Sequence, residues 1–122
     1  MVKLSLFKLI ATKIGVSAQL LISVCSVETG LVNKNNFEDR VEASLGVCQV
    51  QLTTARRFGK HYDMLALQQP RTNILVAAKY LKWQLNRYGS EYMAISSYNA
   101  GSFTTKNQRY VDNVYKIMVE LE

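Results

Sequence analysis

The sequence predicts a mainly α-helical fold for one domain over residues 1–122, with five to seven helices around a cleft and minimal strand. Three observations support this class. Apolar residues recur at helical spacing in several segments. Glycine, proline and serine stand where those segments begin or end. A chain of 122 residues is long enough for one hydrophobic core and too short for a second folded unit.

Two helices are predicted at the N-terminus. Residues 4–14 have helical apolar spacing and stop near Gly15, and Ser17 can cap a second helix that runs to about Glu28. That helix buries one stripe made of Leu20, Leu21, Val24 and Cys25. Glu28 lies three residues after Cys25 and four after Val24, so it is expected at the edge of the buried face.

The middle of the chain carries the only expected β structure. Residues 31–43 are polar and turn-rich, which indicates a surface excursion. Residues 46–52 alternate loosely and predict a short extended piece. Thr53 or Thr54 is then expected to cap a brief helix that Gly59 ends.

The strongest helical pattern follows Pro70 and covers about residues 71–88, closed by Gly89. Ser90 is expected to start the next helix, which Gly101 stops. A last helix begins near Asn107 and has apolar residues at helical spacing: Tyr110, Val111, Val114, Tyr115, Met118 and Leu121.

Composition limits the partners. Fifteen basic and nine acidic residues give a net charge of +6, which favours polyanions in general. The basic residues are spread out, so no nucleic-acid partner is predicted, and the pair Arg56 and Arg57 is assigned to a solvated face. No apolar run approaches the roughly 20 residues that span a bilayer, so no membrane insertion is predicted.

Neither a metal nor a cofactor is predicted, because His61 and two distant cysteines do not make a zinc spacing. Cys25 and Cys48 are described as two buried thiols. The first residues begin like a secretory signal, but Lys8 and Lys13 interrupt the apolar stretch and no cleavage site follows. No ordinary signal peptide is therefore expected.

Glu28 is the predicted centre of the chemistry. It ends the apolar run of residues 20–27 and is followed by Thr29 and Gly30. A carboxylic acid at the mouth of an apolar helix is disfavoured from ionising, so its pKa is expected to rise. Such a group can act as a general acid near neutral pH.

Two further motifs follow in order: "SLGVCQV" at residues 44–50 and "AISSYNAGS" at residues 94–102. With "SVETG" around Glu28, they resemble the catalytic core of the SLT-domain lytic transglycosylases, a family related to goose-type lysozyme. "SVETG" matches the Glu-Ser pattern of that family with Thr29 in place of serine. "LGVCQV" matches its Gly-Leu-Met-Gln-Ile pattern and keeps Gly46 and Gln49.

The third motif is the least degenerate, since "SYNAG" reproduces the Tyr-Asn-Ala-Gly sequence of the family at Tyr98 and Asn99. "RYVDNV" resembles its last element and implies Tyr110 as a further wall of the cleft. The resemblance covers about residues 17–118. It implies a lysozyme-like α+β fold with minimal strand, and it allows Cys25 and Cys48 to approach each other, so a single disulfide stays possible.

The resemblance also implies an activity. Lytic transglycosylases cut peptidoglycan between MurNAc and GlcNAc and form a 1,6-anhydroMurNAc end, with one glutamate as acid and then base. It assigns that role to Glu28 and assigns substrate binding to Thr29, Gly46, Gln49, Tyr98, Asn99 and Tyr110. Each of these residues also has a structural interpretation, such as a tight turn at Gly46, backbone bonding by Gln49, or core packing by the tyrosines.

Two alternative functions remain open. A goose-type muramidase would hydrolyse the same bond with an added carboxylate from Asp39, Glu38 or Glu42. A non-catalytic wall-binding protein would keep the fold without turnover. The expected place of action is the bacterial cell wall, in the periplasm, with delivery by a phage particle or a secretion machine.

Overall fold

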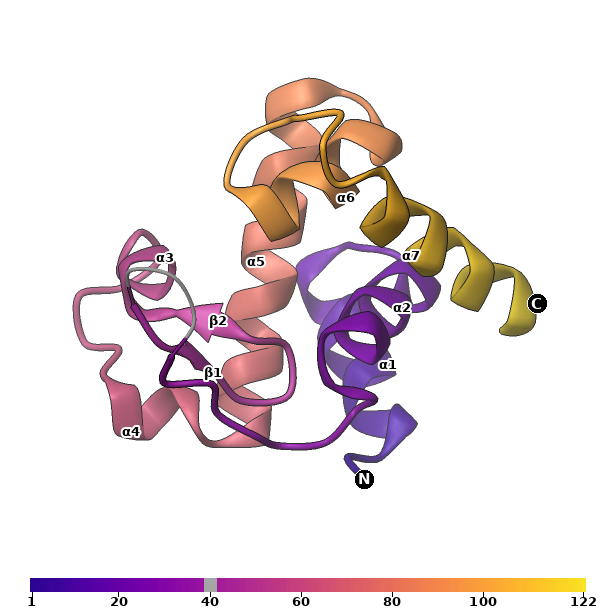
Figure 1. The fold of residues 1–122 in the computed structure, drawn as a ribbon. Coiled ribbons are helices and arrows are strands. Elements are labelled where there is room, and N and C mark those ends of the chain that lie inside the picture. The colour runs from indigo at the N-terminus through magenta and orange to yellow at the C-terminus, as the bar shows by residue number, and fades with distance from the viewer. Residues whose placement is uncertain (39–41) are drawn as a thin grey trace.

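Helix α5 (Pro70–Tyr88) runs through the middle of the molecule, and the other elements pack around it (Figure 1). The computed structural model describes residues 1–38 and 42–122. Pro70 occupies the first turn of α5, where a missing N–H costs nothing, and Gly89 ends it in the left-handed conformation. The helix predicted over about residues 71–88 is confirmed, and its apolar residues Ile74, Ala77, Ala78 and Leu81 are fully buried.

Helices α1 (Leu4–Ile14) and α2 (Ala18–Thr29) confirm the prediction for the N-terminal part. The Ser17 hydroxyl accepts a hydrogen bond from the Leu20 N–H, as expected of an N-cap. All six residues from Leu20 to Cys25 are buried rather than a single stripe. The reason is that α1 packs on one side of α2 and α7 on another, so α2 is enclosed (Figure 1).

The expected extended piece is a tight hairpin. Strand β1 (Ser44–Leu45) pairs antiparallel with β2 (Val50–Gln51), and residues 46–49 form the turn between them. The prediction of one extended run over residues 46–52 was therefore wrong in its centre. Gly46 and Gln49 both have positive φ, which reverses the chain within four residues.

Helix α3 (Leu52–Arg56) confirms the brief helix but not its predicted ends. Its N-cap is Gln51, which makes no side-chain capping bond, and the Thr53 hydroxyl instead donates to the Glu42 carboxylate. The helix ends at Arg56 rather than at Gly59. A four-residue helix that the sequence did not predict, α4 (Met64–Leu67), follows and is capped by Asp63.

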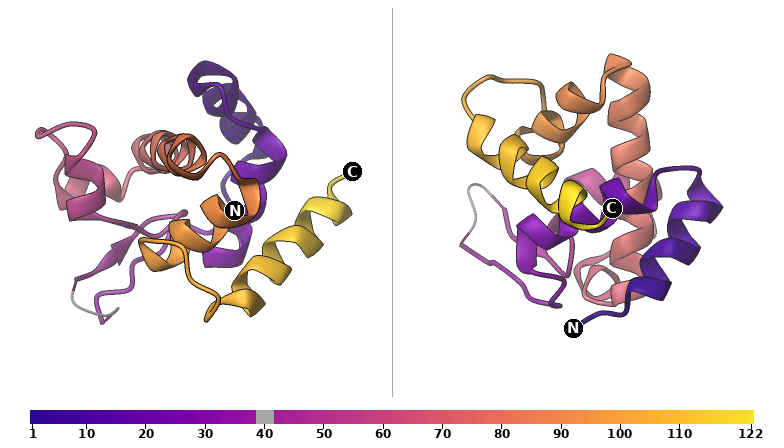
Figure 2. Two further views of the ribbon diagram at one scale, coloured as in Figure 1. Left: turned by 90° about the horizontal axis from the view of Figure 1, so that it is seen from above. Right: turned by 90° about the vertical axis from the view of Figure 1, so that its right-hand side faces the viewer.

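Helices α6 (Glu91–Ala100) and α7 (Gln108–Glu120) complete the fold. Ser90 caps α6 by accepting from the Met93 N–H, and Gly101 ends it, both as predicted. Helix α7 lies across α2 and α6, with Val111 and Val114 in the core. Seen from above, α5 stands almost end-on between the hairpin with α3 on one side and α1 with α2 on the other (Figure 2).

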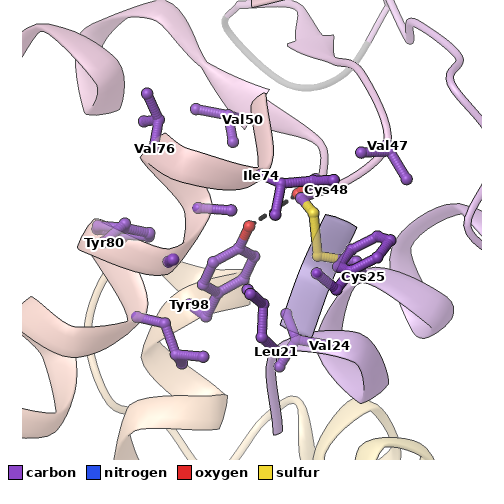
Figure 3. Close-up of a cluster of buried hydrophobic side chains, with 14 of the residues drawn as sticks. Leu21, Val24, Cys25, Val47, Cys48, Val50, Ile74, Val76, Tyr80 and Tyr98 are labelled. Atoms are coloured by element: carbon purple, nitrogen blue, oxygen red, sulfur yellow. Dashed lines mark hydrogen bonds between the residues drawn. A yellow bond between two sulfur atoms is a disulfide. The ribbon is translucent and has the colours of Figure 1, made fainter. Parts of the chain in front are cut away.

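Cys25 and Cys48 form a disulfide with an S–S distance of 2.02 Å, so the description as two buried thiols was wrong. The bond joins the buried face of α2 to the hairpin turn (Figure 3). The mainly α architecture predicted from the sequence is confirmed. Over the described ranges 1–38 and 42–122, no helix is long and apolar enough to cross a membrane.

Candidate active site

A cleft of about 500 Å³ opens between the hairpin with α3 on one side and α5 with α6 on the other, and the end of α2 reaches into it. Its lining is mostly polar. Among the described residues, Glu28 is the one carboxylate that lines the cleft and Arg57 the one cation. The other lining residues are Asn36, Ser44, Gln49, Val50, Gln51, Thr53, Thr54, Tyr80, Tyr98, Asn99, Ala100 and Gly101.

Glu28 is half-buried on the last turn of α2, at the edge of the buried face, as the sequence predicted. Its carboxylate accepts a hydrogen bond of 2.7 Å from the Tyr110 hydroxyl of α7. Burial raises the pKa of Tyr110 well above its ordinary value, and the negative charge of Glu28 raises it further. The phenol therefore keeps its proton and acts as a donor to Glu28.

Tyr98 forms part of both the core and the cleft. It is 8% exposed, and its hydroxyl donates to the main-chain carbonyl of Cys48 at 2.8 Å (Figure 3). Burial, followed by the charge of Glu28, raises the pKa of Tyr98 well above its ordinary value. The phenol of Tyr98 is therefore close enough to be affected by the charge of Glu28, but its hydrogen bond is donated to the hairpin turn. Its contact with substrate stays a prediction.

The tight turn at Gly46 requires glycine. Its φ is +76°, and an added Cβ would lie 2.3 Å from the Asn73 side-chain nitrogen and 2.7 Å from the Leu67 carbonyl oxygen. The turn therefore packs directly on α5 and the end of α4. This geometry fits the structural interpretation of Gly46, and a contact between Gly46 and substrate stays a prediction.

Asn73 is a site residue that the sequence analysis missed. It is fully buried on α5, and its side-chain oxygen accepts from the Cys48 N–H at 2.9 Å. Its side-chain nitrogen donates to the carbonyls of Leu45 and Leu67, each at 2.7 Å. One amide thus satisfies three main-chain groups of the turn and its surroundings. Within the sequence, Asn73 was indistinguishable from a polar residue on the solvated face of a helix.

Gln49 and Thr29 hold the turn from the other side. The Gln49 side-chain nitrogen donates to the carbonyls of Lys34 and Gly46, at 2.9 and 3.0 Å, while the residue lines the cleft. The Thr29 hydroxyl donates to the Val47 carbonyl at 2.6 Å, which ties the end of α2 to the turn. Thr29, which stands where the motif has serine, therefore keeps a hydroxyl, and this hydroxyl has a structural role.

Asn99 lines the cleft at the end of α6. Its side-chain oxygen accepts from the Asn107 side-chain nitrogen at 3.0 Å, and that same nitrogen donates to the Ser96 carbonyl at 2.9 Å. Asn107, which the sequence marked only as the start of a helix, thus positions Asn99. The structure brings together Glu28, Gln49, Tyr98 and Asn99 as lining of one cleft, with Tyr110 bonded to Glu28.

The carboxylates considered for a hydrolase do not join Glu28 in the described part of the cleft. Glu38 is exposed, and Glu42 accepts from the hydroxyl of Thr53; neither lines the cleft. Asp39 lies outside the described residues.

The mainly helical fold with its small two-stranded sheet is that of the lysozyme-like class, and a half-buried carboxylate at the end of an enclosed helix lines its polar cleft. The family model described as Transglycosylase SLT domain matches residues 5–117. The chain belongs to this family, and its function is of the lytic transglycosylase type, acting on peptidoglycan in the bacterial cell wall. No curated protein sequence matches the chain.

Proposed function

We propose that this domain cleaves the β-1,4 bond between MurNAc and GlcNAc in peptidoglycan and leaves a 1,6-anhydroMurNAc end, with Glu28 as the single general acid and base. The observation that carries the proposal is the position of Glu28. It is the one carboxylate lining the cleft among the described residues, and the half-buried phenol of Tyr110 fixes its direction. The family assignment supplies the substrate class.

In the first step the protonated Glu28 carboxyl donates its proton to the glycosidic oxygen. The bond between C1 of MurNAc and that oxygen breaks, and GlcNAc leaves with a free 4-hydroxyl. The MurNAc ring becomes oxocarbenium-like at C1. This step requires the protonated form of Glu28.

In the second step the Glu28 carboxylate accepts the proton of the MurNAc 6-hydroxyl, and O6 bonds to C1. The ring closes and Glu28 regains its proton, so no water is consumed. The first step leaves Glu28 as the carboxylate that the second step needs, and the hydrogen bond from Tyr110 stabilises this charged form. Tyr110 thus supports the carboxylate and also keeps it aimed at the cleft.

Hydrolysis by a muramidase mechanism would end in a reducing sugar instead. An inverting hydrolase needs a second carboxylate to activate water, several ångströms from the acid. Mass spectrometry of products from purified sacculi separates the two reactions, because an anhydro end lacks one water relative to a reducing end. Reducing ends alone would contradict the transglycosylase proposal.

Glu28→Gln tests the catalytic role. We expect this variant to lose about a thousandfold or more in the rate of sacculus clearing, because the amide can neither donate nor accept the proton. The far-UV circular dichroism should match that of the unchanged protein, which shows that the fold is intact. Clearing by the variant at the normal rate would refute the role of Glu28, and a variant that is folded and inactive excludes a purely wall-binding function.

Periplasmic action and delivery by a phage particle or a secretion machine are also part of this proposal. They are supported by the small, basic domain, whose charge of +6 favours the acidic polymers of the wall.

A further inference from the structure

Arg57 stands at the α3 end of the cleft, beside a row of aromatic rings on α5 and α6. Its guanidinium carbon lies 4.8 Å from the centre of the Trp83 ring, within cation–π range. Trp83 stacks on Tyr80, with ring centres 6.2 Å apart and an angle of 12°, and Tyr80 contacts Tyr98 at 5.3 Å. The row therefore extends from Arg57 to Tyr98, the tyrosine whose pKa the charge of Glu28 raises.

Stacking holds the guanidinium without using its N–H groups. A guanidinium that lies on an aromatic face keeps the donors at its edge for another partner. Within the described ranges, the Arg57 guanidinium makes no ion pair and no hydrogen bond, although the residue lines the cleft. The aromatic contact thus holds the Arg57 guanidinium in place at the cleft, and its N–H groups can donate hydrogen bonds to a bound molecule.

The other two arginines nearby are arranged differently. Arg56 does not line the cleft, and its side chain donates to the Tyr62 carbonyl at 3.3 Å. Arg87 lies 5.3 Å from the Trp83 ring centre, and its side chain donates to the Gly101 carbonyl at 3.2 Å. Both have main-chain partners. Arg87 also adds a second positive charge next to Trp83, which strengthens the attraction of an anion to Arg57.

We propose that Arg57 determines specificity by binding a carboxylate of the peptidoglycan substrate, carried by the lactyl group of muramic acid or by its stem peptide. The sugar rings of the strand are neutral, so these carboxylates are the anions that a strand in the cleft can offer to a guanidinium. The arginine edge matches a carboxylate with two parallel N–H donors. The proposal rests on the proposed function only in placing a glycan strand in the cleft.

Binding of glycan strands tests this with a matched pair of variants. Arg57→Gln and Arg56→Gln remove the same charge from neighbouring residues, of which only the first lines the cleft. Both are made in the Glu28→Gln protein, so that the strands stay intact during the measurement. Circular dichroism of each variant checks the fold.

Three soluble strand preparations distinguish the sources of the carboxylate. The first keeps its stem peptides. In the second an amidase removes the peptides and exposes the lactyl carboxylates. In the third these carboxylates are converted to neutral methylamides with carbodiimide and methylamine. We expect Arg57→Gln to weaken binding about five- to tenfold on the first or second preparation, a size typical of a charged hydrogen bond near solvent, and to leave the third unchanged.

Loss on the stripped strands identifies the lactyl carboxylate, and loss on peptide-bearing strands alone identifies the stem peptide. Arg56→Gln should change each affinity by less than about twofold, as an exposed charge outside the cleft does. Equal effects of the two variants, or equal loss by Arg57→Gln on the neutral methylamide strands, would overturn the proposal. Turnover by the Glu28→Gln protein would instead overturn the proposed function, and would be seen as shortening of the strands.

Discussion

The two sides of the cleft are each stabilised by a different kind of contact. On the hairpin side, the turn at residues 46–49 is fixed by the disulfide and by side chains that bond to its main chain, including Asn73 and Tyr98. On the helical side, Glu28 and Tyr110 meet through their side chains. The first set is neutral and buried, whereas the second includes a group that changes charge during the proposed reaction.

This difference predicts how each wall responds to mutation. Loss of a buried neutral contact leaves unsatisfied backbone groups in both the free and the substrate-bound protein, so it costs folding stability. Loss of a contact to an ionisable group alters the balance between its two protonation states, so it changes the pH dependence of the rate. Three substitutions test this contrast, in order of expected effect on stability.

Asn73→Leu should have the largest effect. The substitution keeps the number and branching of the side-chain heavy atoms but leaves the Cys48 N–H and two carbonyls buried without their partner, which we expect to lower the free energy of unfolding by about 3–5 kcal/mol. Urea unfolding followed by Trp83 fluorescence measures it. Asn86→Leu is the matched control on the exposed face of the same helix and should cost less than about 0.5 kcal/mol. Equal costs would show that the amide of Asn73 does not hold the turn.

Gly46→Ala should follow, at about 2–4 kcal/mol, because the new methyl group meets both a positive φ and tightly packed atoms of Asn73 and Leu67. Gly89→Ala separates the two causes. Gly89 has a φ of +64° and nothing within 4 Å of an added Cβ, so only the backbone cost of about 1 kcal/mol applies. Thermal or urea unfolding of the two variants should differ by the packing part, and identical values would contradict it.

Tyr110→Phe should have the smallest effect on stability, about 1 kcal/mol, and a clear effect on the pH profile. The lost hydrogen bond stabilises the ionised carboxylate of Glu28, so without it Glu28 keeps its proton to higher pH. Because the proposed first step needs the protonated acid, the alkaline limb of kcat/KM should move to higher pH while the rate falls.

Tyr98→Phe is the control for that shift. It removes a similar hydroxyl, but one that donates to the Cys48 carbonyl, so we expect a comparable loss of stability and an alkaline limb that stays in place. An equal displacement of the limb in both variants would show that the bond between Tyr110 and Glu28 is not its cause.

Much of the fold could be predicted because its signals are local. Ser17 and Ser90 cap helices, Gly15, Gly89 and Gly101 follow helix ends, and the structure confirms each of them. Glu28 was found at the edge of a buried face for the same reason, since helical spacing alone places it there.

The contacts that shape the site depend on residues far apart in the chain, and the sequence did not reveal them. Asn73 bonds to a residue 25 positions away, and nothing around it distinguishes a buried asparagine from a solvated one. The ends of α3 were misplaced because Thr53 bonds to Glu42 instead of capping its own helix. The resemblance placed Tyr110 at the cleft, but helical spacing explained it equally well as core, and its bond to the Glu28 carboxylate could not be predicted from the sequence.

The bond between Cys25 and Cys48 has a kinetic consequence. Both residues have no exposed surface, so a small thiol reagent can attack the sulfurs only after the side chains packed around the disulfide have moved away. The rate of reduction in native buffer therefore reports how fast the core around this bond opens. At high reagent concentration the rate of reduction should level off at the rate of this opening, which is thereby measured directly.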